Sequence, residues 1–177
     1  MFLPDWQPIC RNLPREMEYA NIFFIHDWHF GSELFDHKKW EKFKRKVLND
    51  DHSFVCWIGD MMENAIPGSK SDPLLQKLSP FEQKEMFIEQ LIDFGDKTIS
   101  VNPGNHEYNR TTKVSGLYPM YDICMYAGVD EKYYYNCQWE FYGENKPVAA
   151  TLKIKGHDII KRVQSKYYKC PTLTTCN

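Results

Sequence analysis

Three short, continuous apolar runs are the feature that most restricts the folds open to this chain. They are ANIFFI at 20–25, SFVCWI at 53–58 and KTISVN at 97–102. Runs of this length without polar alternation are typical of strands that are buried on both faces. Segments with helical signals separate them, and this order predicts a parallel sheet with right-handed crossovers. The sequence therefore predicts an α/β fold built on a βαβαβ unit.

The first connecting segment, 32–49, predicts an amphipathic helix with Ser32 as its N-cap. Charged residues separate its apolar positions, which recur at helical spacing at Leu34, Trp40, Phe43 and Val47. This pattern predicts a helix that packs one face on the sheet and leaves the other face in solvent.

The second connecting segment, 79–95, carries start and stop signals of a helix. Ser79 is a preferred N-cap residue, and Pro80 suits the first turn. Glu82 completes a capping box with Ser79, and Gly95 suits the stop. The sequence therefore predicts a helix between the second and the third strand.

The remainder of the chain carries weaker signals. An apolar segment at 115–127 predicts another helix, although Pro119 lies inside it. The segments 132–143 and 147–156 predict strands of a more antiparallel kind. We expect these elements to belong to one domain that spans residues 1–177.

The composition narrows the class of protein. The hydrophobic share is 42%, and the net charge of -2 gives no general basic field that would attract nucleic acid. No apolar run approaches the roughly 20 residues of a membrane span, and the N-terminus lacks the pattern of a signal peptide. The six cysteines form no CxxC pair, so reduced thiols are favoured over disulfides. We expect a cytoplasmic protein with no membrane partner, and the oligomeric state is left open.

Each of the three predicted strands runs directly into a polar cluster. The first is followed by Asp27 and His29, the second by Asp60, and the third by Asn105 and His106. In open α/β sheets, ligands bind beyond the carboxyl ends of the strands. We therefore expect two carboxylates, two imidazoles and an amide to meet at one edge of the sheet.

This set of donor atoms is the one that a divalent first-row metal prefers. Carboxylate and carbonyl oxygens suit Mn²⁺, and imidazole extends the choice to Fe²⁺ and Zn²⁺. If the Asp27–His29 triplet is extended, its first and third side chains face one ion while Trp28 points away. Gly59 and Gly104 would let the backbone turn before the second and third clusters.

Taken in order, the three motifs resemble those of the calcineurin-like metallophosphoesterase family, most closely its small phage and bacterial members. The resemblance covers roughly residues 20–110. Gly-Asn-His-Glu is its most specific motif, whereas Asp-x-His and Gly-Asp are weak alone. The matching residues are Asp27-x-His29, Gly59-Asp60 and Gly104-Asn105-His106-Glu107.

The resemblance implies a complete domain of two sheets flanked by helices, a four-layer αββα sandwich, of which βαβαβ is one half. It also implies two divalent metal ions, Mn²⁺, Fe²⁺ or Zn²⁺, and hydrolysis of a phosphoester, such as a nucleotide or a nucleic acid. Asp27 and His29 would bind the first ion, Asp60 would bridge both, and Asn105 would bind the second. His106 would act on the substrate phosphate as the catalytic residue.

The chain departs from the family pattern toward its end. Family members carry a further metal-binding histidine and then Gly-His-x-His, whereas here Gly156-His157 is followed by Asp158 and Ile159. His157 is a candidate for the earlier lone histidine. We therefore expect an atypical or truncated C-terminal part. A catalytically impaired remnant that keeps the fold, a nuclease of the same family and a protein-interaction module are alternatives to the phosphoesterase.

Several polar residues near the motifs have no single predicted role. Arg110 is either a donor to a substrate phosphate or a surface arginine. His26 is predicted to pack beside the strand end, and Glu63 and Asn64 lie near the predicted site without an assigned role. Each cluster also has a purely structural explanation as a capped turn or a hydrogen-bonded strand end. Only their occurrence together favours a metal site.

Overall fold

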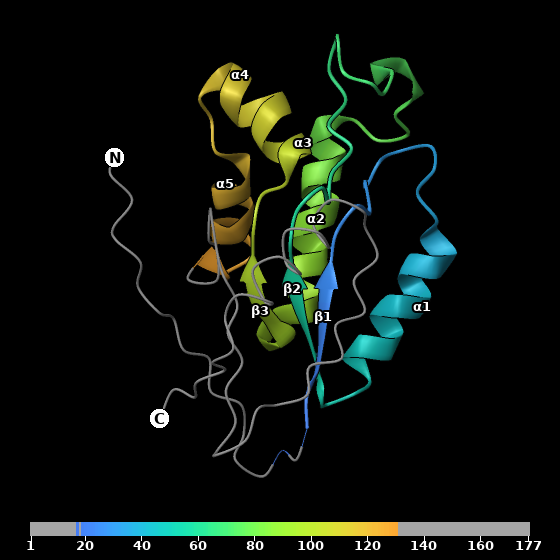
Figure 1. Ribbon diagram of the computed structural model, residues 1–177, viewed down its shortest axis with the longest axis vertical. Helices are drawn as coiled ribbons and strands as arrows, with labels where there is room; N and C mark the ends of the chain where they lie inside the picture. The colour runs from blue at the N-terminus through green and yellow to red at the C-terminus, as the bar shows by residue number, and fades with distance from the viewer. Residues whose placement is uncertain (1–16, 18, 131–177) are drawn as a thin grey trace, which may run out of the picture.

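The computed structural model describes residues 17 and 19–130 (Figure 1). Its centre is a three-stranded parallel sheet with the strand order β1-β2-β3, as the apolar runs predicted. Asn21 pairs with Ser53 at the start of the first ladder, and the register shifts between Val55 and Cys56 in the second. The strands are β1 (Asn21–Ile25), β2 (Ser53–Trp57) and β3 (Thr98–Val101).

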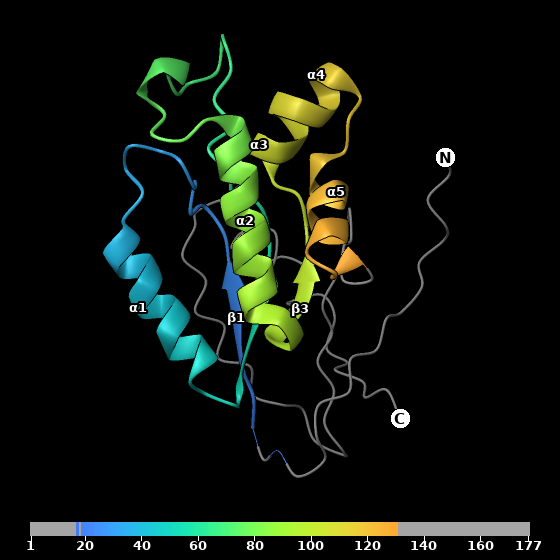
Figure 2. The same ribbon diagram turned by 180° about the vertical axis from the view of Figure 1, so that it is seen from behind.

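Helices pack on one face of this sheet. Figure 2 shows α2 in front of the strands when the molecule is seen from behind, with α1 and α5 on either side. The longer helices are α1 (His37–Leu48), α2 (Pro80–Phe94) and α5 (Pro119–Tyr126). The short helical turns are η1 (Pro73–Leu75), η2 (Gly95–Lys97), α3 (Asn105–Glu107), η3 (Tyr108–Thr112, a π-helical turn) and α4 (Lys113–Ser115).

The main core lies between the sheet and these helices. Trp40 from α1 contacts the rings of Trp57 and Phe94, with ring centroids 6.1 Å apart in both pairs. A separate cluster on the opposite face of the sheet contains Phe24, Cys56 and Ile58, all buried. No helix that the structure describes covers this second face. The sheet is therefore apolar on both sides, which explains why its strands read as continuous apolar runs.

The helix α1 begins later than the sequence predicted. Its N-cap is Asp36, whose Oδ1 accepts a hydrogen bond from the Lys39 N–H at 3.0 Å, so Ser32 as N-cap is wrong. Before the helix begins, Phe30 forms a parallel bridge with Met62. This bridge keeps the chain around Phe30 extended beside the segment that follows β2. As a consequence Leu34 lies outside the helix and is 87% exposed.

The helix α2 has the ends that its sequence predicted. The Ser79 side chain accepts from the Glu82 N–H, the Glu82 side chain accepts from the Ser79 N–H, and Gly95 ends the helix with φ 46°. The predicted helix at 115–127 is shorter, because Pro119 fits only in a first turn and α5 begins there. The predicted strands at 132–143 and 147–156, with His157, lie outside the described residues.

Two glycines allow the loops after β2 and β3 to touch. Gly59 has φ 102°, and a Cβ placed on it would lie 2.3 Å from Gly104 Cα. Gly104 has φ −92° and ψ −169°, which any residue adopts, so the expected turn at this glycine is wrong. A glycine is needed at this position because a side chain would not fit: a Cβ there would lie 2.1 Å from the Asp60 nitrogen. The contact brings the second and third polar clusters together.

Replacing Gly59 with alanine should therefore destabilise the fold more than replacing a glycine that has only an unusual φ. We expect Gly59→Ala to lower the free energy of unfolding by about 3 kcal/mol, from overpacking and backbone strain together. Gly116 is the matched control, because its φ is 73° but nothing lies within 4 Å of a Cβ there. Gly116→Ala should cost about 1 kcal/mol. Urea denaturation measures both, and equal losses would contradict the close contact.

Within the described part of the chain, the structure contains no helix with the length and apolar character needed to cross a membrane.

Candidate metal centre

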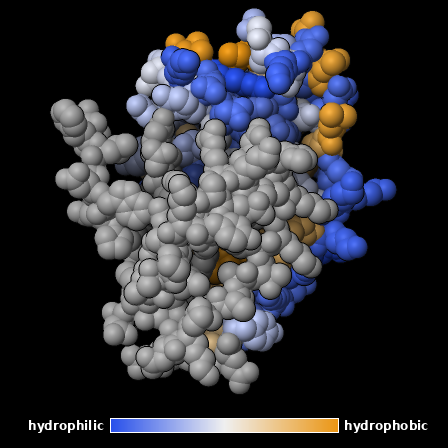
Figure 3. Space-filling model, viewed as in Figure 1, coloured by the Kyte–Doolittle hydropathy of each residue, from blue (hydrophilic) through white to orange (hydrophobic). Residues whose placement is uncertain are grey.

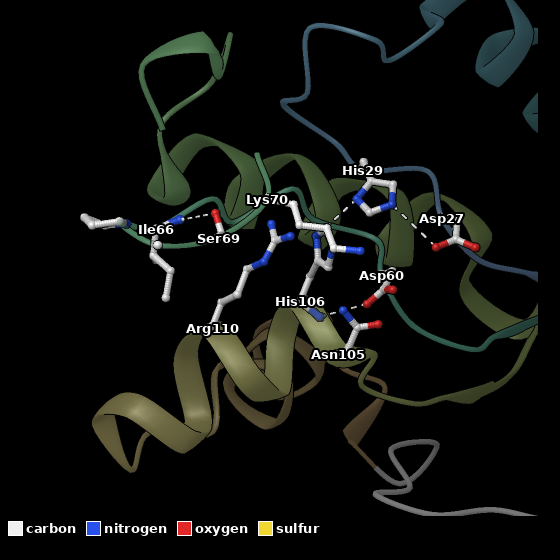
Figure 4. Close-up of a pocket in the computed structure, with 11 residues that line it drawn as sticks. Asp27, His29, Asp60, Ile66, Ser69, Lys70, Asn105, His106 and Arg110 are labelled. Atoms are coloured by element: carbon white, nitrogen blue, oxygen red, sulfur yellow. Dashed lines mark hydrogen bonds and ion pairs between the residues drawn. The ribbon is translucent and has the colours of Figure 1, made fainter. Parts of the chain in front are cut away.

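A cavity of about 490 Å³ opens at the carboxyl edge of the sheet (Figure 4). This edge is the upper part of the molecule in Figure 3, where hydrophilic residues are mixed with a few hydrophobic ones. All five residues that the sequence singled out line the cavity, so the expected convergence of the three clusters is observed. The lining residues are Asp27, His29, Asp60, Asn105, His106, the loop 66–70 and Arg110.

The Asp27–His29 segment has a conformation that the sequence did not predict. Asp27 and His29 have φ of 55° and 50°, so the segment is left-handed at both residues and not extended. Trp28 still points away into the core, with its ring centroid 4.7 Å from that of Trp40. The carboxylate of Asp27 lies 3.5 Å from His29 Nε2. Both side chains therefore face the cavity because the backbone is left-handed at each residue, and not because alternate residues of a strand share a face.

Two histidines surround the Asp27 carboxylate. His26, which is buried as predicted, places Nδ1 at 2.5 Å from Asp27 Oδ2. Hydrogen bonds from His26 and His29 hold the pKa of Asp27 well below its usual range. Burial acts to lower the pKa of His29, but the carboxylates of Asp27, Glu63 and Asp60 outweigh it and raise that pKa. This end of the cavity thus favours cations.

Asp60 joins the second motif to the third. Its φ is 53°, and its Oδ1 accepts a hydrogen bond from the His106 N–H at 2.8 Å. In Figure 4 the Asp60 carboxylate lies between the side chains of Asn105 and Asp27. Asp60 therefore holds the backbone of the third motif and also presents an oxygen to the cavity.

The imidazole of His106 has a defined tautomer. Its Nδ1 lies 2.8 Å from the Glu63 carbonyl oxygen and 3.2 Å from that of Met62. Carbonyl oxygens only accept, so Nδ1 carries a hydrogen and Nε2 has the free lone pair of the neutral ring. Burial lowers the pKa of His106, and the charge of Asp60 opposes this change.

Three of the lining residues come close enough to hold a metal ion. One ligand atom from each of His29, Asp60 and His106 lies within 4.8 Å of the other two. This group differs from the set implied by the family resemblance, because it includes the predicted catalytic residue His106. The Nδ1 atoms of the two histidines are 3.1 Å apart. The donor set of imidazole nitrogen and carboxylate oxygen fits Mn²⁺, Fe²⁺ or Zn²⁺.

Glu107, the last residue of the third motif, does not line the cavity. It is fully buried, and its carboxylate accepts three backbone hydrogen bonds, from the N–H groups of Asp60, Met62 and Gly104 at 2.8 to 3.0 Å. Burial raises the pKa of Glu107, and these N–H groups act in the opposite direction. Its spacing from Gly104 is that of a capping box, which is the sequence signal for this role.

On the sequence alone, Glu63 had no assigned role, and Arg110 was either a donor to a substrate phosphate or a surface arginine. The structure places Arg110 in the lining of the cavity. The Glu63 carboxylate lies 3.2 Å from His29 Nδ1 and 3.1 Å from Arg110 Nη1. Burial acts to raise the pKa of Glu63, but hydrogen bonds from Ser71 and Arg110 outweigh it and lower that pKa. Glu63 therefore connects the metal-binding side of the cavity with an arginine.

Comparisons with protein-family models, with curated proteins and with solved structures gave no match to this chain. The resemblance to the metallophosphoesterases therefore rests on its motifs, and the assignment of roles to these residues stays a prediction.

The role of Glu107 can be tested by removing one of its acceptor oxygens. Glu107→Gln replaces an oxygen with an amide NH₂, which would face a backbone N–H, so we expect a loss of about 2 kcal/mol in the free energy of unfolding. Glu89→Gln on the exposed side of α2 is the same chemical change and should have no measurable effect. If both variants unfold at the same denaturant concentration, Glu107 does not connect the two loops.

Proposed function

We propose that this chain is a metal-dependent phosphoester hydrolase of the calcineurin-like metallophosphoesterase type. The observation that carries the proposal is the meeting of the three ordered motifs around one cavity. Parallel strands bring their carboxyl ends to one edge of a sheet, and the residues at that edge are those that the family uses. A chance arrangement of capped turns would not require all five side chains to line the same cavity.

The proposal extends to the fold. In a four-layer sandwich a second sheet packs against the first, so the first sheet must be apolar on the face away from its helices. The cluster of Phe24, Cys56 and Ile58 on that face supports such an arrangement. The described helices lie on the other face, where they form one outer layer (Figures 1 and 2).

The residues divide into metal-holding and proton-moving roles. Asp27, His29 and Asp60 would hold one ion, and Asp60 with Asn105 would hold the other. When bound, the ions supply Lewis-acid stabilisation of the phosphate charge and lower the pKa of a water molecule. His106 acts on the substrate through Nε2, because Nδ1 is held by the Glu63 carbonyl. To protonate the leaving oxygen, the ring first takes up a proton at Nε2 and returns to its neutral Nδ1–H form when it gives that proton away.

The backbone of the site also has a role in this proposal. The bond from the His106 N–H to Asp60 fixes the distance between a metal ligand and the proton donor. Glu107 fixes the two loops behind them. The chain therefore orients its reactive side chains before any substrate enters, which is the condition for efficient proton transfer.

Removing the Asp60 carboxylate tests the proposed activity. We expect Asp60→Asn to reduce Mn²⁺-dependent hydrolysis of bis(p-nitrophenyl) phosphate by at least about 100-fold, because the amide has lost the charge that holds two cations. Asp51→Asn, an exposed change in the turn before β2, is the control and should retain activity. Unchanged turnover in Asp60→Asn would disprove the assignment.

Metal binding can be measured without any substrate. Titration calorimetry with Mn²⁺ or Zn²⁺ should give a saturable isotherm for the wild type and a much weaker one for Asp60→Asn. At a free metal concentration 100 times the Kd, the free energy of unfolding should rise by about 2.7 kcal/mol. An isotherm without saturation in the wild type would favour the catalytically impaired remnant over the enzyme.

A further inference from the structure

The cavity has a second end that the proposed chemistry does not use. In Figure 4, Asp27, Asp60 and Asn105 lie on one side, and the loop 66–70 with Arg110 lies on the other. His106 lies between these two sides. A volume of about 490 Å³ is in the range of cavities that hold whole small molecules, and a phosphate group alone does not fill it. The second end is therefore available to the rest of a substrate.

Arg110 reaches this end with two nitrogens that donate to none of the described residues. Its Nη1 donates to the Glu63 carbonyl at 2.5 Å and to the Glu63 carboxylate at 3.1 Å. These two bonds use both hydrogens of Nη1. To the residues that the structure describes, Nε and Nη2 donate no hydrogen bond. The side chain is only 12% exposed. A fixed, half-unsatisfied guanidinium that lines a cavity is a site for an anion with oxygen acceptors.

Lys70 adds a second positive charge to the cavity, and in Figure 4 its side chain extends from the loop 66–70 toward His106. It belongs to a tight turn in which Ser69 Oγ accepts from the Ile66 N–H at 3.2 Å and donates to the Ser71 carbonyl at 2.8 Å. Lys70 itself is exposed and lines the cavity, and it forms no ion pair with a carboxylate among the described residues. Within the described part of the chain, its ammonium group is thus available to an anion.

We propose that Arg110 and Lys70 bind a second phosphate group of the substrate, so that the preferred phosphoester is a nucleotide-sized molecule with two phosphates. This inference rests on the proposed function, which places the reacting phosphate at the other end of the cavity. Ile66 and Pro67 also line the cavity and offer apolar surface to the organic part of the molecule. In Figure 4, Ile66 lies beyond Arg110 as seen from the Asp60 side. Glu63 fixes Arg110 and contacts His29, so it sets the separation of the two ends.

Two chromogenic substrates that differ by one phosphate test this inference. They are thymidine 5′-(p-nitrophenyl phosphate) and the same compound with a 3′-phosphate. With Mn²⁺ present, the 3′-phosphate should raise kcat/KM of the wild type by about tenfold, mainly through KM, because charge-assisted hydrogen bonds add to ground-state and transition-state binding alike. Lys70→Ala and Arg110→Gln should each reduce this preference to about threefold or less.

Lys113→Ala is the matched control, because Lys113 is an exposed lysine in α4 that does not line the cavity. It removes the same charge and should keep the tenfold preference. Equal kcat/KM for both compounds in the wild type would overturn the inference. An equal loss of preference in Lys113→Ala and Lys70→Ala would also overturn it, because the effect would then reflect net charge.

The outcome can be separated from a failure of the proposed function. If the wild type hydrolyses neither compound, the hydrolase proposal fails, and the ratio of the two Kd values from calorimetry then measures the preference for the second phosphate. Circular dichroism shows whether Arg110→Gln is folded. If it is not, Lys70→Ala decides alone, because Lys70 is exposed and its removal leaves the packing unchanged.

Discussion

The Glu107 carboxylate is the interaction on which the geometry of the cavity depends. It lies behind the site and accepts N–H groups from the loop after β2 and from the loop after β3. A buried carboxylate is stable only with several donors, so the two loops must stay together for Glu107 to remain buried. The absence of a side chain at Gly59 and Gly104 makes this approach sterically allowed. The distance between Asp60 and His106 follows from these contacts.

Much of the sheet and part of the site could be predicted from the sequence. Continuous apolar runs identify strands buried on both faces, and the observed sheet is apolar on both sides. The convergence of Asp27, Asp60 and His106 followed from parallel strands alone, since these place their carboxyl ends at one edge. The ends of α2 were also predictable, because a capping box is a local interaction that tertiary contacts did not override.

Other features depend on tertiary contacts that a single sequence does not display. The late start of α1 follows from the bridge between Phe30 and Met62, which lie 32 positions apart. The pairing of Glu63 with Arg110 joins the loop after β2 to η3 in the same way. The left-handed backbone at His29 arises because its N–H donates to the Asp60 carbonyl. In each case local propensity was outweighed by a partner distant in sequence.

The left-handed residues around the cavity have a consequence for how such a chain can evolve. Among the described residues, the non-glycine positions with positive φ are Asp27, His29, Asp60 and Asn64. For residues other than glycine this conformation costs of order 1 kcal/mol each, although asparagine and aspartate tolerate it best. Selection for thermal robustness alone would favour glycine at these positions. A lineage that lost the need for chemistry here would therefore be expected to drift toward glycine and gain stability as it did so.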